Sequence, residues 1–209
     1  MKNRILSIMK PFALSIAALA IFALGQSEAR ADLVTFSTAG CFGAACAPAA
    51  TATTTGSGTA SLTFTAQPPT TVNTGTPSGF TIADLGTLTL TGAGTFSSTP
   101  FTLQVNQTSP SVGSGVFGGT LSGTVIANGS DVRIVFNQTF LTLGNVTYQL
   151  NNLTNGNTLF LDSPATGGIT RISATVSTPV PEPATMLLLG TGLSGVAAAV
   201  RKRRKAAGK

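Results

Sequence analysis

Polar and apolar residues alternate along much of this chain. Ala60, Leu62 and Phe64 take every second position of a segment with threonine or serine between them, and residues 87–91 and 101–106 repeat the pattern. Side chains of a β-strand point alternately to its two faces, so a period of two predicts one apolar and one hydroxyl-bearing face. These segments are therefore predicted to be half-buried antiparallel strands.

Turn residues separate the alternating segments. Asn128-Gly129 predicts a type I′ hairpin between a glycine-interrupted strand at residues 116–127 and a strand around Ile134. Gly144-Asn145 and Asn155-Gly156 predict further turns. About nine short strands joined in this way predict an all-β fold, either an antiparallel β-sandwich or a jelly-roll-like body.

The predicted β body covers residues 59–178. Residues 32–58 ahead of it are predicted to hold an N-terminal strand, a cysteine loop and, at residues 51–58, a low-complexity linker. Cys41 and Cys46 are the only cysteines, and in an oxidising compartment their spacing predicts a disulfide. Two thiols in a chain without histidine make a metal site the weaker interpretation.

The N-terminus has the pattern of a secretory signal peptide. Basic residues among the first ten precede an apolar run at residues 11–24, and Ala29 and Ala31 then occupy the small-residue positions of a cleavage site. We expect signal peptidase to remove residues 1–31, so that the mature chain begins at Asp32. An uncleaved membrane anchor is the alternative, although an apolar run of 14 residues is short for one.

The C-terminus has the pattern of a membrane helix with a cytoplasmic end. The apolar run at residues 184–200 holds 17 residues, enough for a helix of about 25 Å. Cations are costly to move across a bilayer, so the cluster that follows should remain in the cytoplasm and the preceding chain should lie outside. That cluster consists of Arg201, Lys202, Arg203, Arg204 and Lys205.

Pro181, Glu182 and Pro183 stand just before the apolar run. The two prolines resist helix formation and favour an extended segment that a processing enzyme could grip. A Pro-Glu-Pro triplet, an apolar run and a basic end, in this order at the C-terminus, resemble the PEP-CTERM sorting signal of Gram-negative bacteria. A plain membrane anchor after a proline-rich linker is the alternative interpretation.

The resemblance covers residues 179–209 and implies a processing route. In that family a membrane-embedded, transpeptidase-like protease called exosortase is thought to recognise and remove the tail, in species that make exopolysaccharide. Pro181, Glu182 and Pro183 would then be recognition residues of a substrate. The protein would be exported, held at the inner membrane, and finally displayed at the cell surface or released.

Charge becomes informative once the terminal signals are set aside. Ten of the 12 lysines and arginines lie in those signals, and Asp32–Thr178 has two arginines and four aspartates, a net charge of −2. This part of the chain has no lysine and no basic patch with interleaved aromatic residues. Nucleic acid is therefore not an expected partner.

The chain offers little for catalysis. It has no histidine, which excludes Ser-His-Asp and Cys-His arrangements and imidazole metal sites. Asp84, Asp131 and Asp162 are candidates for a carboxylate pair that cleaves glycosides, but isolated aspartates beside turns are more often turn formers. No Asp-x-Asp-x-Asp-Gly calcium loop occurs. We expect no enzyme activity, no metal and no cofactor.

Binding of sugars is the stronger rival to a structural role. The chain has no tryptophan, and its one tyrosine, Tyr148, falls in the inward phase of its strand. The outward positions hold threonine, serine and asparagine, a surface suited to hydration and hydrogen bonding. Asn-x-Ser/Thr triplets also occur; they are glycosylation acceptors in eukaryotic secreted proteins, and by-products of Asn/Thr-rich turns in a bacterium. They begin at Asn106, Asn128, Asn137, Asn145 and Asn152.

The prediction for function is an exported, non-catalytic envelope or matrix protein with a structural or adhesive role beside exopolysaccharide. A carbohydrate-binding β-sandwich module is the alternative, and a glycan-active enzyme comes third.

Overall fold

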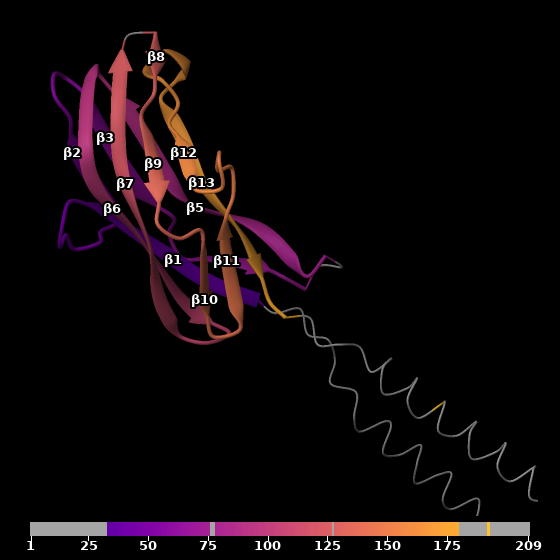
Figure 1. The fold of residues 1–209 in the computed structure, drawn as a ribbon. Helices are drawn as coiled ribbons and strands as arrows, with labels where there is room; N and C mark the ends of the chain where they lie inside the picture. The colour runs from indigo at the N-terminus through magenta and orange to yellow at the C-terminus, as the bar shows by residue number, and fades with distance from the viewer. Residues whose placement is uncertain (1–32, 76–77, 127, 180–191, 193–209) are drawn as a thin grey trace, which may run out of the picture. The chain divides into compact units, whose positions relative to one another are not determined.

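The computed structural model describes residues 33–75, 78–126, 128–179 and 192 (Figure 1). Residues Ala31–Pro179 form one compact unit, which we call the body. Within the described residues, no helix has both the length and the apolar character needed to cross a membrane. The terminal predictions lie outside the described residues: the signal peptide with Ala29 and Ala31, the Pro181–Pro183 triplet, the apolar run at 184–200 and the basic cluster at 201–205.

The body consists of two antiparallel β-sheets (Figure 1). Sheet A has the order β12 (Thr158–Phe160), β9 (Arg133–Phe136), β7 (Gly113–Ile126), β6 (Gly94–Ser109), β1 (Leu33–Phe42) and β4 (Thr70–Asn73), with β8 (Gly129–Ser130) beside β7. Sheet B has the order β10 (Phe140–Leu143), β11 (Val146–Leu150), β13 (Ile169–Ser177), β5 (Phe80–Thr91), β3 (Ser61–Ala66) and β2 (Thr51–Thr55). A short 3-10 helix, η1 (Pro164–Thr166), precedes β13. The predicted all-β, antiparallel fold is confirmed.

The inner faces of the two sheets form one hydrophobic core. The Phe101 ring of sheet A contacts aromatic rings of both sheets, with centroids 5.7 Å from Phe64 of sheet B and 6.4 Å from Phe136 of sheet A. Leu62 and Phe64, which alternation predicted to point inward, are fully buried. Burial of the apolar face is thus what fixes the register of these strands, because a shift by one residue would expose it.

The prediction of a linker at residues 51–58 was wrong. Thr51–Thr55 forms β2, which pairs with β3 as the edge strand of sheet B. Threonine is β-branched and favours strands, so a threonine-rich segment gains ladder hydrogen bonds once β3 is available as a template. The boundary at residue 59 is therefore not a boundary of the fold, since the body starts near Ala31.

Of two predicted turns, one differs from its prediction and one agrees with it. The predicted hairpin at Asn128-Gly129 exists, but Gly129 pairs with Ile126 and so lies in β8 instead of in the turn. Gly144-Asn145, by contrast, is the two-residue connection that was predicted, with Leu143 paired to Val146 and Gly144 at φ 59°. That left-handed conformation is one that glycine adopts without steric cost.

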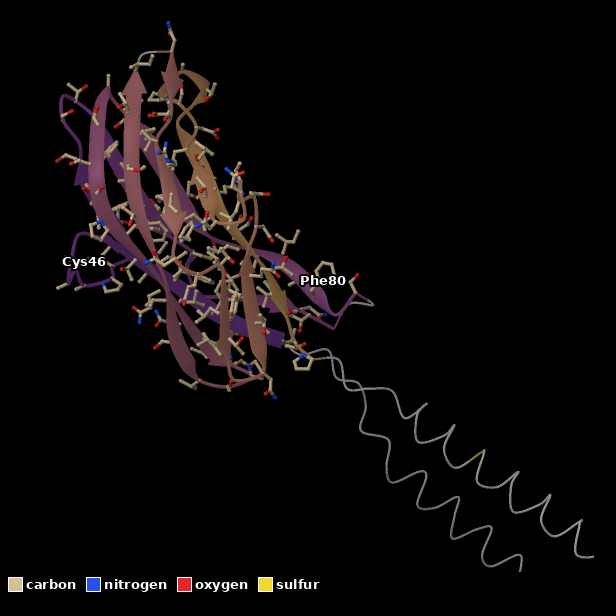
Figure 2. All side chains as sticks on the ribbon, viewed as in Figure 1. Cys46 and Phe80 are labelled. Carbon is tan, nitrogen blue, oxygen red and sulfur yellow. A yellow bond between two sulfur atoms is a disulfide. The ribbon has the colours of Figure 1, made fainter. Side chains whose placement is uncertain are left out.

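The two cysteines are bonded to each other. The Cys41–Cys46 disulfide has a Cα–Cα distance of 5.8 Å and closes a small loop at the end of β1. Figure 2 shows Cys46 and Phe80 projecting from opposite sides of the body. The loop is therefore remote from the start of β5, where Phe80 lies.

Candidate functional site

The outer face of β2, β3 and β5 has hydroxyl side chains in a regular pattern, which we call the threonine array. Strand pairing aligns its members in three rows: Thr53 with Thr63 and Thr89, Thr51 with Thr65 and Thr87, and Thr55 with Ser61 and Thr91. Neighbouring strands lie about 4.8 Å apart, and alternate residues along a strand lie about 6.8 Å apart. The hydroxyls therefore form a two-dimensional lattice.

Packing on the opposite face directs the array outward. Leu62 and Phe64 of β3 and Leu88 and Leu90 of β5 are buried in the core, so the threonines between them point away from it. The ring of Phe64 lies against Gly86, where a Cβ would come within 2.6 Å of the ring. A larger residue at that position would push β3 and β5 out of this alignment.

Only part of the hydrogen-bonding capacity of the array is used internally. The hydroxyls of Thr53 and Thr63 lie 3.1 Å apart, and the Thr91 hydroxyl donates to the Ser61 carbonyl over 3.4 Å. Such cross-strand pairs stabilise a sheet by about 0.2–1 kcal/mol each. A hydroxyl has one donor and two acceptor sites, so the array keeps capacity for an external partner.

The array is electrically neutral and ends at an ion pair. Its members are threonines and one serine, and the next strand, β13, places Arg171 beside Thr87. The Arg171 guanidinium binds the Asp84 carboxylate over 3.1 Å, with side chains 72% and 44% exposed. An exposed pair of this kind adds little to stability. The neutral surface is suited to an uncharged, hydroxyl-rich partner.

The three candidate catalytic aspartates do not converge. Asp84 belongs to sheet B, whereas Asp131 and Asp162 flank strands of sheet A. Asp131 and Asp162 lie on adjacent segments, as the hydrogen bond of 2.9 Å from the Leu161 amide to the Val132 carbonyl shows. Among the described residues, no three His, Cys, Asp or Glu side chains form a group that could hold a metal ion.

Tyr148 is fully buried, as its inward phase predicted. Its hydroxyl donates to the Gln107 side-chain carbonyl over 2.8 Å, and its ring meets Phe36 edge to face with centroids 5.7 Å apart. Burial raises the pKa of the Tyr148 phenol above its ordinary value. The ring is therefore a core residue, and it has no surface to offer for stacking on a sugar.

The exposed aromatic side chains among the described residues are phenylalanines, and none of them was predicted as a site residue. Phe80, Phe140 and Phe160 are 46%, 66% and 46% exposed. Phe140 lies on the outer face of sheet B, where it pairs with Gln149 of β11. The signal that could have found Phe140 is its place in the outward phase of a strand whose inward residue is Leu143.

The described residues thus form an all-β domain of two antiparallel sheets, which ends where a sorting signal begins. A family model for the PEP-CTERM protein-sorting motif matches residues 179–204. This confirms the resemblance of the tail, and the protein has a PEP-CTERM sorting domain. Comparison with curated proteins and with solved structures gives no match.

The matched motif indicates the route of the protein but not the task of its body. It supports export, a membrane-anchored sorting intermediate and processing through exosortase. The match covers residues 179–204 alone and leaves both sheets outside it. The role of the body has to be argued from its surface.

Proposed function

We propose that the body is a non-catalytic structural or adhesive component of the extracellular polysaccharide matrix or the cell envelope. The observation that carries this proposal is the threonine array, a neutral lattice of hydroxyls on the outer face of β2, β3 and β5. Polysaccharides present many hydroxyls themselves and exchange hydrogen bonds readily with such a surface. Export through a PEP-CTERM motif supports a setting outside the cytoplasm.

The expected mode of binding is weak at each contact and additive along a polymer. A hydrogen bond exchanged with water contributes only about 0.5–1.5 kcal/mol net. Several rows of the array can engage one chain, and several copies of the protein can engage one polymer, which raises the overall affinity without new contacts. Such binding is suited to a matrix component and does not require a deep pocket.

The test is co-sedimentation of the purified body with exopolysaccharide from the native host. The double substitution Thr53→Val and Thr63→Val keeps the β-branched shape and removes a hydroxyl pair from the array. Two net hydrogen bonds of about 0.5 kcal/mol each predict binding weakened about fivefold or more.

A matched control exists on sheet A. Thr95 and Thr124 are exposed and have hydroxyls 3.0 Å apart, so Thr95→Val with Thr124→Val makes the same chemical change on another face. This variant should bind like the unchanged protein. Equal loss of binding in both variants, or no loss in either, would show that the array is not the contact surface.

A carbohydrate-binding module with an aromatic contact is the second candidate. Phe140 is 66% exposed on the outer face of sheet B and could stack on a sugar ring, a role that Tyr148 cannot take. In this case short, defined oligosaccharides would bind saturably, and Phe140→Ala would abolish binding while Thr53→Val with Thr63→Val would not. A glycan-active enzyme is third; turnover that disappears with Asp131→Asn or Asp162→Asn would establish it.

A further inference from the structure

Both ends of the body lie at one end of the fold. Leu33, the first residue of β1, pairs with Asn73 at the end of β4. The next residue, Thr74, has its hydroxyl 2.9 Å from that of Thr178, and both residues are buried. Thr178 directly follows β13, and the sorting motif begins one residue later. In Figure 1 the indigo start of β1 accordingly lies beside the orange end of β13.

Two further segments reach this end, which we call the exit end. The first is the turn between β6 and β7, where the Ser109 hydroxyl donates to the Leu33 carbonyl over 3.2 Å. The second is the start of β5, where Phe80 pairs with Ser177, the last residue of β13. Exposed apolar side chains at the exit end include Leu33 at 55% and Val112, in the β6–β7 turn, at 87%.

The described residues contain five charged side chains, and none of them neighbours Leu33 or Val112. Asp131 and Arg133 stand beside β8, near Ile126 at the opposite end of β7. Asp162 follows β12, and the Asp84–Arg171 pair lies within sheet B, with Asp84 two positions beyond Ile82 in β5. The exposed side chains of Val112 and Leu33 can therefore enter a lipid interface without burying the charge of any described residue.

The chain between the body and the predicted membrane anchor is short. Six peptide units separate Thr178 from Ala184, the start of the apolar run, and they span at most about 20 Å. The sorting motif implies a membrane-anchored intermediate, so the exit end is held within this distance of the bilayer. We propose that the exit end rests on the phospholipid surface of the inner membrane as long as the anchor is attached, with Val112 and Leu33 in the interface.

The attachment depends on the tether. A few apolar side chains bind a membrane only marginally on their own, but a tether raises their effective concentration at the surface. Removal of the tail therefore releases the body in one step, without a separate dissociation event. This inference concerns the anchored intermediate and does not rest on polysaccharide binding, so either proposal can fail while the other stands.

The absence of tryptophan from the chain provides a clean probe. The full chain with Val112→Trp would be reconstituted into vesicles of phosphatidylethanolamine and phosphatidylglycerol, with and without brominated acyl chains. We expect brominated lipid to quench tryptophan at position 112 and its emission to shift to the blue. Leu33→Trp, at a residue 55% exposed beside the β6–β7 turn, is a second probe that guards against misfolding of the first.

Ile126→Trp is the matched control. Ile126 is 60% exposed at the other end of β7, and 14 residues of strand, about 45 Å, separate the two probes. Tryptophan at position 126 should remain unquenched in the same vesicles. Equal quenching at the two ends, or none at positions 112 and 33, would overturn the proposal. Quenching at position 112 that persists in a chain ending at Pro179 would overturn the dependence on the tether.

Discussion

Tyr148 joins the two sheets through a buried polar cluster. Its hydroxyl donates to Gln107, whose side-chain NH₂ donates to the Ser111 and Leu143 carbonyls over 2.9 and 3.3 Å. Tyr148→Phe would leave the Gln107 carbonyl oxygen buried without its partner. We expect the free energy of unfolding to fall by about 1–3 kcal/mol, measured by urea denaturation at neutral pH. An unchanged midpoint and slope would contradict this role of the hydroxyl.

The same phenol makes stability depend on alkaline pH. Burial raises the pKa of Tyr148 in the folded state, so above its ordinary value of about 10 the unfolded chain loses a proton that the folded chain keeps. Stability should be complete below about pH 10 and decline above it. The body has no lysine, so few other groups titrate there. Denaturation at several alkaline pH values would show the decline, and Tyr148→Phe should remove most of it.

Whether a side chain points into the core was predictable where the alternation along its own strand decides its direction. The inward phase of Tyr148 and Phe64 follows from alternation within a few residues. Thr38 was not predictable in this way: it is 6% exposed, and its hydroxyl donates to the Leu85 carbonyl over 2.7 Å and accepts from the Gln67 amide over 2.8 Å. Both partners are remote in sequence, so only the tertiary fold makes a buried threonine acceptable there.

Edge strands are the elements that the alternation of polar and apolar residues predicts least well. β2 and β4 each pair with a strand on one side only, β2 with β3 and β4 with β1. An edge strand buries less apolar surface than a central one, so a threonine-rich or proline-flanked segment can form it. In composition such a segment resembles a linker or a loop. The threonine array could therefore be only half predicted. The alternation of β3 and β5 was visible, but its first column belongs to β2.

The turn after β5 packs against the turn before β3. The Thr59 amide donates to the Ala93 carbonyl over 2.9 Å, and a Cβ on Gly92 would collide with the Thr59 carbonyl oxygen. Gly92→Ala adds this clash to the strain of φ +73° and should destabilise the body by about 2–4 kcal/mol, measured by thermal or urea unfolding.

Gly156→Ala separates the clash from the strain. Gly156 has φ +83°, but a Cβ at this position would have no neighbouring atom within 4 Å, so the substitution should cost only about 1–2 kcal/mol. The difference between the two variants measures how tightly the two turns pack. Equal losses would mean that the backbone conformation alone accounts for the effect at Gly92.

The predicted processing of both termini would reverse the charge of the whole molecule. The complete chain has a net charge of +6, whereas Asp32–Thr178 has −2. Electrostatic attraction to anionic lipid is therefore expected only of the terminal signals. Isoelectric focusing should show the released form at an acidic point, far from the basic point of the precursor. A released form that remains basic would mean that the tail is retained.

Intact mass is the decisive measurement for the whole molecule, because it locates both processing events at once. In the native host we expect a released species that begins at Asp32 and lacks the residues after about Pro183, and a membrane-bound precursor that keeps Lys209. Glu182→Ala alters the matched motif without touching the body, so the precursor should accumulate in the membrane and the released species should be lost. Asp162→Ala, a change within the body, is the control and should be released normally. If the membrane form of the unchanged protein keeps Lys209 and nothing is released, the tail acts as a permanent anchor, and the body functions at the membrane surface.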